Sequence, residues 1–140
     1  MKELRVEADR KYMQTVQDFV NEVLEENPKC SRKDVLEIHM VVDEIFGNIA
    51  DYAYDDKPGP VIIVVDTDEE GVIALTFSDE GKPYDPMSSE DPDVSLPARE
   101  RSLGGLGIFM VKNVMDELGY EYRNGRNILT MRKRIGGKHA

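Results

Sequence analysis

The sequence is short of the features that mark secreted and membrane proteins. Cys30 is the only cysteine among 140 residues, which excludes an internal disulfide and a zinc site built from several cysteines. Nowhere do about 18 uncharged apolar residues follow one another, and the N-terminal residues lack the apolar stretch of a signal peptide. We therefore expect a cytoplasmic protein that does not bind a membrane.

Positive charge is also scarce. The chain has 18 lysines and arginines against 28 aspartates and glutamates, which gives a formal net charge of -10. Because a phosphate backbone attracts a basic surface, this balance argues against nucleic acid as the main partner. The length suits one domain with a substantial core and is too short for two, so we expect residues 1–140 to form a single domain.

Helical periodicity is clear in the first half of the chain. Apolar residues recur at intervals of three and four across residues 10–26, which predicts a first helix. Ser31 is a good N-cap, with Asp34 three residues later, and predicts a second long helix over residues 32–54. Proline and glycine at 58–60 end that helical pattern.

Short runs of β-branched residues indicate the first strands. We expect one strand around Leu4 and Val6, and a hairpin formed by residues 61–66 and 72–77. Residues 82–103 then form an irregular segment rich in proline. Such a long loop inside a compact domain is either a functional lid or a passive loop.

Glycines surround the third predicted helix. Gly104, Gly105 and Gly107 precede an apolar pattern over residues 108–118, and Gly119 follows it, where a C-terminal glycine is favoured. The end of the chain predicts a second hairpin, because Asn124 and Gly125 form the turn between two further runs, 120–123 and 126–134. We interpret the basic residues at 132–134 as protection of an edge strand.

The order of these elements predicts the fold class. Three helices and about five strands favour a two-layer α/β sandwich. We expect a mixed, mostly antiparallel sheet with all three helices on one face.

The second helix carries a line of polar side chains. At about 100° per residue, Glu44, Asn48, Asp51 and Asp55 all fall within about 40° of Glu37, while the apolar residues gather on the neighbouring face. The polar face can hold a metal ion or move a proton. Taken alone, it can equally be a solvated acidic stripe.

Two other features can act together with this face. Asp79 and Gly81 follow the second strand of the first hairpin, where a carboxylate can accept a hydrogen bond from an exocyclic amine such as that of adenine. The sequence GGLG at 104–107 is neither a P-loop nor a dinucleotide fingerprint. Glycines at a helix start nevertheless let backbone N–H groups approach a phosphate.

Three motifs carry a resemblance to a known family. The sequence DEIFGNIADYAY resembles the N box of the GHKL ATPase superfamily, FSDEGKP its first glycine box, and RSLGGLGIFMVKNVMD its second. The spacing and the ending RNILTMRK are most similar to the bacterial anti-sigma-factor serine/threonine protein kinases. The resemblance covers nearly the whole chain and implies a Bergerat-type sandwich with an ATP lid at about 82–103.

The resemblance also implies a function and partners. Members of that family bind Mg²⁺-ATP and phosphorylate a serine or threonine of a small antagonist protein of the STAS type. They regulate transcription by switching between that antagonist and a sigma factor, and the family suggests a homodimer.

The resemblance assigns roles to single residues. Glu44 would be the catalytic acid/base, Asn48 the magnesium ligand and Asp79 the carboxylate that reads adenine. Gly81 would let the backbone pass close to the base. The lid residue Arg101 would reach a phosphate, as a bidentate guanidinium can, and the lid hinge and phosphate-facing turn would be formed by Gly104, Gly105 and Gly107.

The chain departs from the family at two positions. Pro83 stands where the first glycine box usually has a second glycine, and Asp51 with Tyr52 stands where related kinases often carry a basic or histidine residue. Asp51 would repel phosphate unless a metal or a basic group neutralises it. Two alternatives therefore remain: a module that holds ATP and acts by protein contact alone, and a detached sensor-kinase ATPase domain. We interpret His39 as structural, since it lies far from the acidic face.

Overall fold

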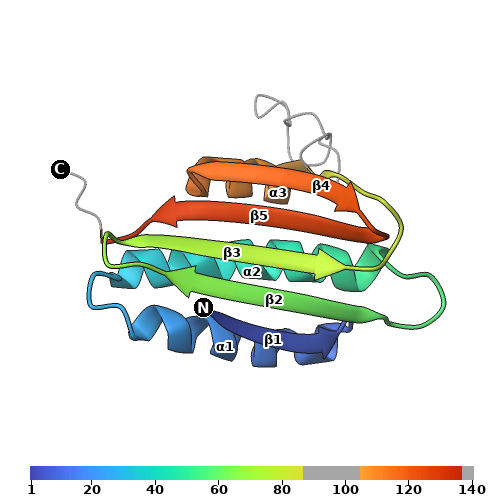
Figure 1. The fold of residues 1–140 in the computed structure, drawn as a ribbon, viewed down its shortest axis with the longest axis horizontal. Coiled ribbons are helices and arrows are strands. Elements are labelled where there is room, and N and C mark those ends of the chain that lie inside the picture. The colour runs from blue at the N-terminus through green and yellow to red at the C-terminus, as the bar shows by residue number, and fades with distance from the viewer. Residues whose placement is uncertain (87–104, 137–140) are drawn as a thin grey trace.

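The computed structural model describes residues 1–86 and 105–136, with only the backbone of residues 105 and 106 (Figure 1). Nine elements follow one another in these residues. They are β1 (Lys2–Glu7), the 3-10 turn η1 (Arg10–Tyr12), α1 (Met13–Glu25), α2 (Arg32–Tyr52), β2 (Pro60–Thr67), β3 (Val72–Asp79), α3 (Gly105–Val114), β4 (Glu117–Arg123) and β5 (Arg126–Arg134).

The described elements form two layers. Five strands make one sheet in the order β1-β2-β3-β5-β4, and the helices α1, α2 and α3 lie together behind it in the view of Figure 1. This confirms the two-layer sandwich and the placement of the helices on one face. None of the described helices is long and apolar enough to cross a membrane.

All pairings among the described strands are antiparallel, which corrects the expectation of a mixed sheet. The connections explain this. Two helices separate β1 from β2, so the chain reverses three times and returns antiparallel to β1. One helix separates β3 from β4, which makes these two strands parallel, but β5 lies between them and pairs antiparallel with both.

The core lies between the sheet and the helices. Alternate residues of the central strands face the helices, and the register aligns Ile63, Phe77 and Leu129 in one row across β2, β3 and β5. All three are almost completely buried. The apolar stripe of α2 packs against them, including the fully buried Ile38 and Phe46. Burial of this kind is the main stabilising term, at about 25 cal/mol per Å² of apolar surface.

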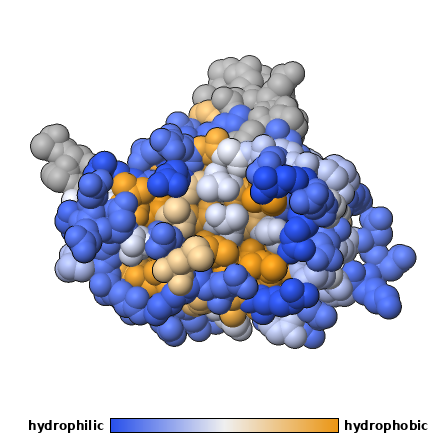
Figure 2. All heavy atoms as spheres, viewed as in Figure 1, coloured by the Kyte–Doolittle hydropathy of each residue, from blue (hydrophilic) through white to orange (hydrophobic). Residues whose placement is uncertain are grey.

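None of the described helices covers the opposite face of the sheet (Figure 1). Half-buried apolar side chains lie there on β2, β3 and β5, among them Ile62, Val64, Ala74 and Ile128. Figure 2 shows this face, on which apolar residues gather over the middle of the sheet and charged residues surround them.

The start of α2 follows the sequence closely. Ser31 Oγ accepts from the N–H of Asp34, and the Asp34 carboxylate accepts in return from the N–H of Ser31, which forms a complete capping box. Asp34 also accepts from the N–H of Gly136, at 2.8 Å. The cap therefore joins the start of α2 to the end of β5. The helix ends at Tyr52, two residues before the predicted limit.

The third helix is shorter at its C-terminal end than the sequence predicts. It ends at Val114, and residues 117–119, which were assigned to the helix and its closing glycine, belong to β4. The apolar spacing of Val114, Met115 and Leu118 fits both structures. The strand prevails because Leu118 pairs with Met131 of β5 and the N–H of Asp116 donates to the carbonyl of Arg132.

The interpretation of the basic residues at 132–134 was also wrong. They lie on β5, which is inside the sheet, while β4 forms the edge. Lys133 is only 12% exposed and pairs with Glu37 of α2 at 3.3 Å. Glu37 is thus a packed ion-pair partner rather than part of a solvated acidic stripe.

Candidate functional site

A cavity of about 200 Å³ lies between α2 and the ends of β3 and β5. Its apolar lining includes Phe77, Leu129 and Ile45, and three tyrosines also line it. Asn48 and Asp79 are among its polar residues. The remaining lining residues are Ile49, Tyr52, Ala53, Lys82, Pro83, Tyr84, Pro86, Tyr120 and Asn127. An apolar cavity with a few polar groups is typical of a site for a small organic ligand.

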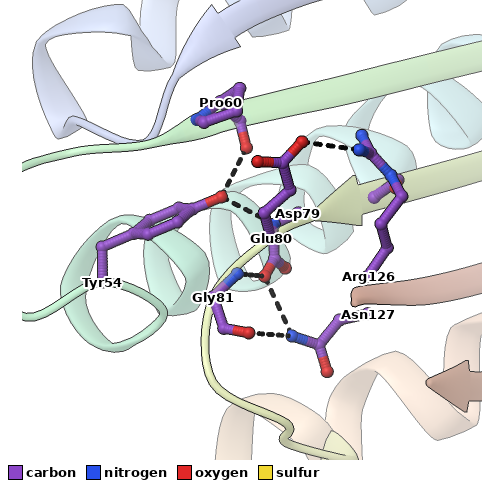
Figure 3. A network of polar contacts seen from close by, with 8 residues as sticks. Tyr54, Pro60, Asp79, Glu80, Gly81, Arg126 and Asn127 are labelled. Atoms are coloured by element: carbon purple, nitrogen blue, oxygen red, sulfur yellow. Dashed lines mark hydrogen bonds and ion pairs between the residues drawn. The ribbon is translucent and has the colours of Figure 1, made fainter. Parts of the chain in front are cut away.

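Asp79 is the last residue of β3 and is 4% exposed. Its Oδ1 accepts from the N–H of Gly81 and from Nδ2 of Asn127, both at 2.9 Å (Figure 3). Its Oδ2 receives no hydrogen bond from any residue that the structure describes. Burial raises the pKa of the carboxyl group, and the hydrogen bonds from Asn127 and Gly81 partly offset this rise. Oδ2 is therefore the oxygen that can accept from a ligand amine.

Gly81 is packed against the end of α2. A Cβ at this position would overlap the carbonyl oxygen of Ala53, and the next residue, Lys82, donates its N–H to that same oxygen at 3.0 Å. The family resemblance implies that Gly81 allows a close approach between the backbone and a base. In the structure the close approach is to α2, and it fixes the loop that follows Asp79.

Gly81→Ala should therefore lower the free energy of unfolding by about 1–3 kcal/mol, as overpacking of a close contact does. The obstructing atom is a backbone carbonyl, which cannot rotate away. Urea denaturation measures the change. Gly119→Ala is the matched control because a Cβ there meets nothing within 4 Å. Equal stability of the two variants would contradict the close packing at Gly81.

Two further side chains hold the same loop (Figure 3). The hydroxyl of Tyr54 donates to the carbonyl of Pro60 and accepts from the N–H of Glu80. Arg126 donates to Ser78 Oγ and to the carboxylate of Glu80, at 3.1 and 2.6 Å. These contacts join β2, β5 and the segment after α2 to the residues on either side of Asp79.

Glu44 and Asn48 lie one turn apart on α2, as predicted. Nδ2 of Asn48 donates to Oε2 of Glu44 at 2.9 Å, which leaves the Asn48 carbonyl oxygen for another partner. Asn48 lines the cavity. Gly107, in the first turn of α3, lies so close to Glu44 that a Cβ there would overlap the carboxyl group. The structure thus brings together Glu44, Asn48 and Gly107, and connects Asn48 with Asp79 through the cavity.

The protein oxygens near Asn48 are too few to bind a metal ion alone, so they suit an ion that is also bound by waters and phosphates. No group of three or more His, Cys, Asp or Glu residues that could hold a metal exists in residues 1–86 and 105–136. Mg²⁺ keeps several waters and binds through one or two protein oxygens together with phosphates. The carbonyl oxygen of Asn48 fits that pattern.

Asp51 does not reach the cavity. It forms a bidentate pair with Arg10 of η1, in which Nε and Nη2 donate to the two carboxylate oxygens at 2.9 Å each. The bonds from Arg10 lower the pKa of Asp51. The guanidinium lies across Gly47, where a Cβ would be 2.9 Å from Nη2. The basic group that the sequence required to neutralise Asp51 is thus Arg10.

The other predicted residues divide into two groups. Asp55 is an exposed partner of Lys82, at 2.8 Å, and is outside the cavity. Gly105 is the first residue of α3. Arg101 and Gly104 lie outside the described residues, as does most of the expected lid.

Asn127 is the main site residue that the sequence did not reveal. It is 6% exposed and lies opposite Asp79 in the register of β3 and β5. The alternation of strand β5 marks it as an inward-facing position, because Leu129 and Met131 share its face. A buried amide two residues after a hairpin turn is the only local signal that could have singled it out.

Comparisons with known proteins agree with this geometry. The model of the family described as histidine kinase-like ATPase domain matches residues 6–133. The serine/threonine-protein kinase BtrW of Bordetella bronchiseptica is 26% identical over 92 residues, which are 66% of this chain and 65% of that protein. An anti-sigma F factor of Geobacillus is 27% identical over 85 residues, which are 61% and 58% of the two chains.

The chain thus spans about three fifths of the length of these curated relatives. Solved structures are similar in fold. The RsbU and RsbW domains of a Mycobacterium tuberculosis protein superpose with a TM-score of 0.64 at 17% identity, over 96% of this chain and 33% of that one. The histidine kinase domain of a blue-light activated kinase from Erythrobacter litoralis gives a TM-score of 0.56 at 17% identity, over 89% and 60%.

Proposed function

The chain belongs to the histidine kinase-like ATPase domain family, and we propose that it binds Mg²⁺-ATP and transfers the γ-phosphoryl group to a serine or threonine of a partner protein. The observation that carries the proposal is that two suitable groups line one cavity. Asp79 offers a carboxylate oxygen for the amine of adenine, and Asn48, hydrogen-bonded to Glu44, lines the same cavity.

Asp79, Asn48 and Glu44 have different roles in this proposal. Asp79 and the apolar residues bind the base. Asn48 would hold a magnesium ion through its carbonyl oxygen, and a bound ion supplies positive charge to the phosphates. Glu44 accepts the proton of the attacking hydroxyl while the bond between the γ-phosphorus and its bridging oxygen breaks and ADP leaves.

The residues before and within α3 complete the site in the proposal. Gly104, Gly105 and Gly107 would present backbone N–H groups to the phosphates, where a helix start favours an anion. Arg101 would contribute a guanidinium from a lid at about 82–103. We propose that residues 1–140 form one domain to which this lid belongs.

The pairing of Asp51 with Arg10 supports a catalytic role over a purely regulatory one. An unpaired carboxylate beside the phosphates would weaken binding, but this carboxylate is neutralised by Arg10 of η1. The names of the two relatives, a serine/threonine-protein kinase and an anti-sigma F factor, support the class of reaction and partner. We propose an antagonist protein of the STAS type as the substrate and a sigma factor as a second partner.

The experiment is transfer of label from γ-labelled ATP with Mg²⁺ to the antagonist-type protein encoded nearby. The expected product is phosphoserine or phosphothreonine, which survives acid. An acid-labile product would indicate transfer to histidine and a sensor-kinase activity. Binding of ATP without any transfer would leave the alternative of a regulatory module that acts by protein contact.

We also propose that two copies associate through the uncovered face of the sheet. Half-buried Ile62, Val64 and Ile128 give this face an apolar centre (Figure 2), and burying such a patch against a second copy removes it from water. Sedimentation of the wild-type chain and of Val64→Lys tests this. A monomeric wild type, or an unchanged Val64→Lys variant, would contradict it.

A further inference from the structure

Asn127 uses its whole side-chain amide on the protein. Nδ2 donates to Oδ1 of Asp79 and to the carbonyl of Lys82, both at 2.9 Å, and the carbonyl of Gly81 lies further away at 3.4 Å. Oδ1 accepts from the N–H of Tyr84, at 3.0 Å, and from the hydroxyl of Tyr120. Two donors and two acceptor lone pairs are all that an amide side chain has.

The two backbone partners of Asn127 stand on either side of Pro83. The carbonyl of Lys82 precedes the proline and the N–H of Tyr84 follows it. Proline has a fixed φ and no N–H of its own, so it cannot help to hold the loop by a backbone hydrogen bond. The side chain of Asn127 bonds to the backbone on both sides of the proline, in place of the backbone hydrogen bond that Pro83 cannot donate.

We propose that Asn127 is the positioning residue of the base-binding pocket, which clamps the loop around Pro83 and turns Oδ2 of Asp79 toward the ligand. The inference rests on the proposed nucleotide function and deepens it. The side chain of Asn127 on β5 holds this loop in its conformation. The loop contains Pro83 where the family usually has a second glycine.

Only an amide of this length fits the contacts. A threonine hydroxyl has one donor and lies one bond closer to the backbone than the amide, so it can keep the bond to Asp79 but leaves the carbonyl of Lys82 and the N–H of Tyr84 without their partner. A carboxylate has no donor at all and would place a like charge beside Asp79. The clamp acts on the loop and on the orientation of Asp79, whereas the Glu44 carboxylate accepts from Asn48 and is not among the residues that line the cavity.

The test compares wild type with Asn127→Thr, and uses Asn113→Thr as the matched control. Asn113 is exposed on α3, and among the described residues its side chain bonds to the nearby carbonyl of Phe109 alone. The hydrogen-exchange rate of the Tyr84 amide, measured without nucleotide, reports whether its bond to residue 127 is present. Titration with ADP gives the Kd of the pocket, and steady-state phosphoryl transfer gives KM and kcat separately.

In Asn127→Thr the Tyr84 amide should exchange at least about tenfold faster, since losing one hydrogen bond is typically worth about a factor of ten. The Kd for ADP and the KM for ATP should rise about 10- to 100-fold while kcat changes little. Asn113→Thr should match wild type in all three measurements.

Unchanged exchange at Tyr84 in Asn127→Thr would overturn the clamp, whatever the nucleotide data. Faster exchange with an unchanged Kd for ADP would overturn the role in the pocket while the proposed function stands. A fall in kcat equal to the rise in KM would also overturn it, because the residue would then act on the reacting groups. If wild type itself binds no ADP, the proposed function fails, and the clamp measured at Tyr84 loses its assigned purpose.

Discussion

Replacing Glu44 with glutamine is expected to lower phosphoryl transfer by about 10²- to 10⁴-fold, the usual contribution of a general base. Glutamine keeps the size of the side chain and an oxygen that can accept from Nδ2 of Asn48. The wall of the cavity therefore stays in place, and only the ability to take a proton is lost. We expect kcat to fall while the Kd for ADP remains close to that of wild type.

Glu37→Gln is a sharp control for this prediction. It is the same chemical change two turns earlier on α2, at a residue that pairs with Lys133 and is outside the cavity. Transfer by this variant should equal that of wild type. If Glu44→Gln transferred phosphate at the wild-type rate, proton acceptance by Glu44 would be refuted and catalysis would rest on positioning alone.

Much of the fold could be predicted because its signals are local. The cap formed by Ser31 and Asp34, the period of α2 and the Asn124-Gly125 turn each specify structure within a few residues of themselves. Glu44 and Asn48 are one helical turn apart, so their hydrogen bond follows from the helix alone. Local interactions therefore predict the contact between Glu44 and Asn48 as well as the elements.

The features that the sequence did not predict depend on contacts between distant segments of the chain. Asn127 meets Asp79 because β3 and β5 pair in one register across 48 residues of sequence. A helical angle placed Asp51 near Glu44 but could not show Arg10, which comes from the turn before α1. The end of α3 was misplaced for the same reason, since pairing with β5 decides between two structures that the apolar spacing allows.

Asp79→Asn is expected to weaken ADP binding by about 10²-fold. The variant keeps an oxygen for Asn127 and Gly81, so its amide nitrogen must take the place of Oδ2 and faces the exocyclic amine with a donor. Both the charged hydrogen bond and the acceptor are lost, each worth about 1–3 kcal/mol. Because guanine has a carbonyl where adenine has the amine, the preference for ADP over GDP should narrow or reverse.

The same variant should be more stable than wild type at neutral pH. Burial raises the pKa of Asp79, so the folded chain binds this proton more tightly than the unfolded chain does. The free energy of unfolding then rises as pH falls from the raised pKa toward about 3.9, the unfolded value. Asparagine has no such proton, and its advantage over wild type should shrink across that window.

Thermal denaturation of wild type and Asp79→Asn at several pH values isolates this contribution, because the carboxylates that titrate in both proteins cancel in the difference. Asp66→Asn, at an exposed carboxylate on β2, controls for the loss of one negative charge. A variant that loses both ADP affinity and stability would indicate that Asp79 is chiefly structural. Loss of affinity with a gain in stability would identify a buried charge that is retained for its ligand at a cost to the fold.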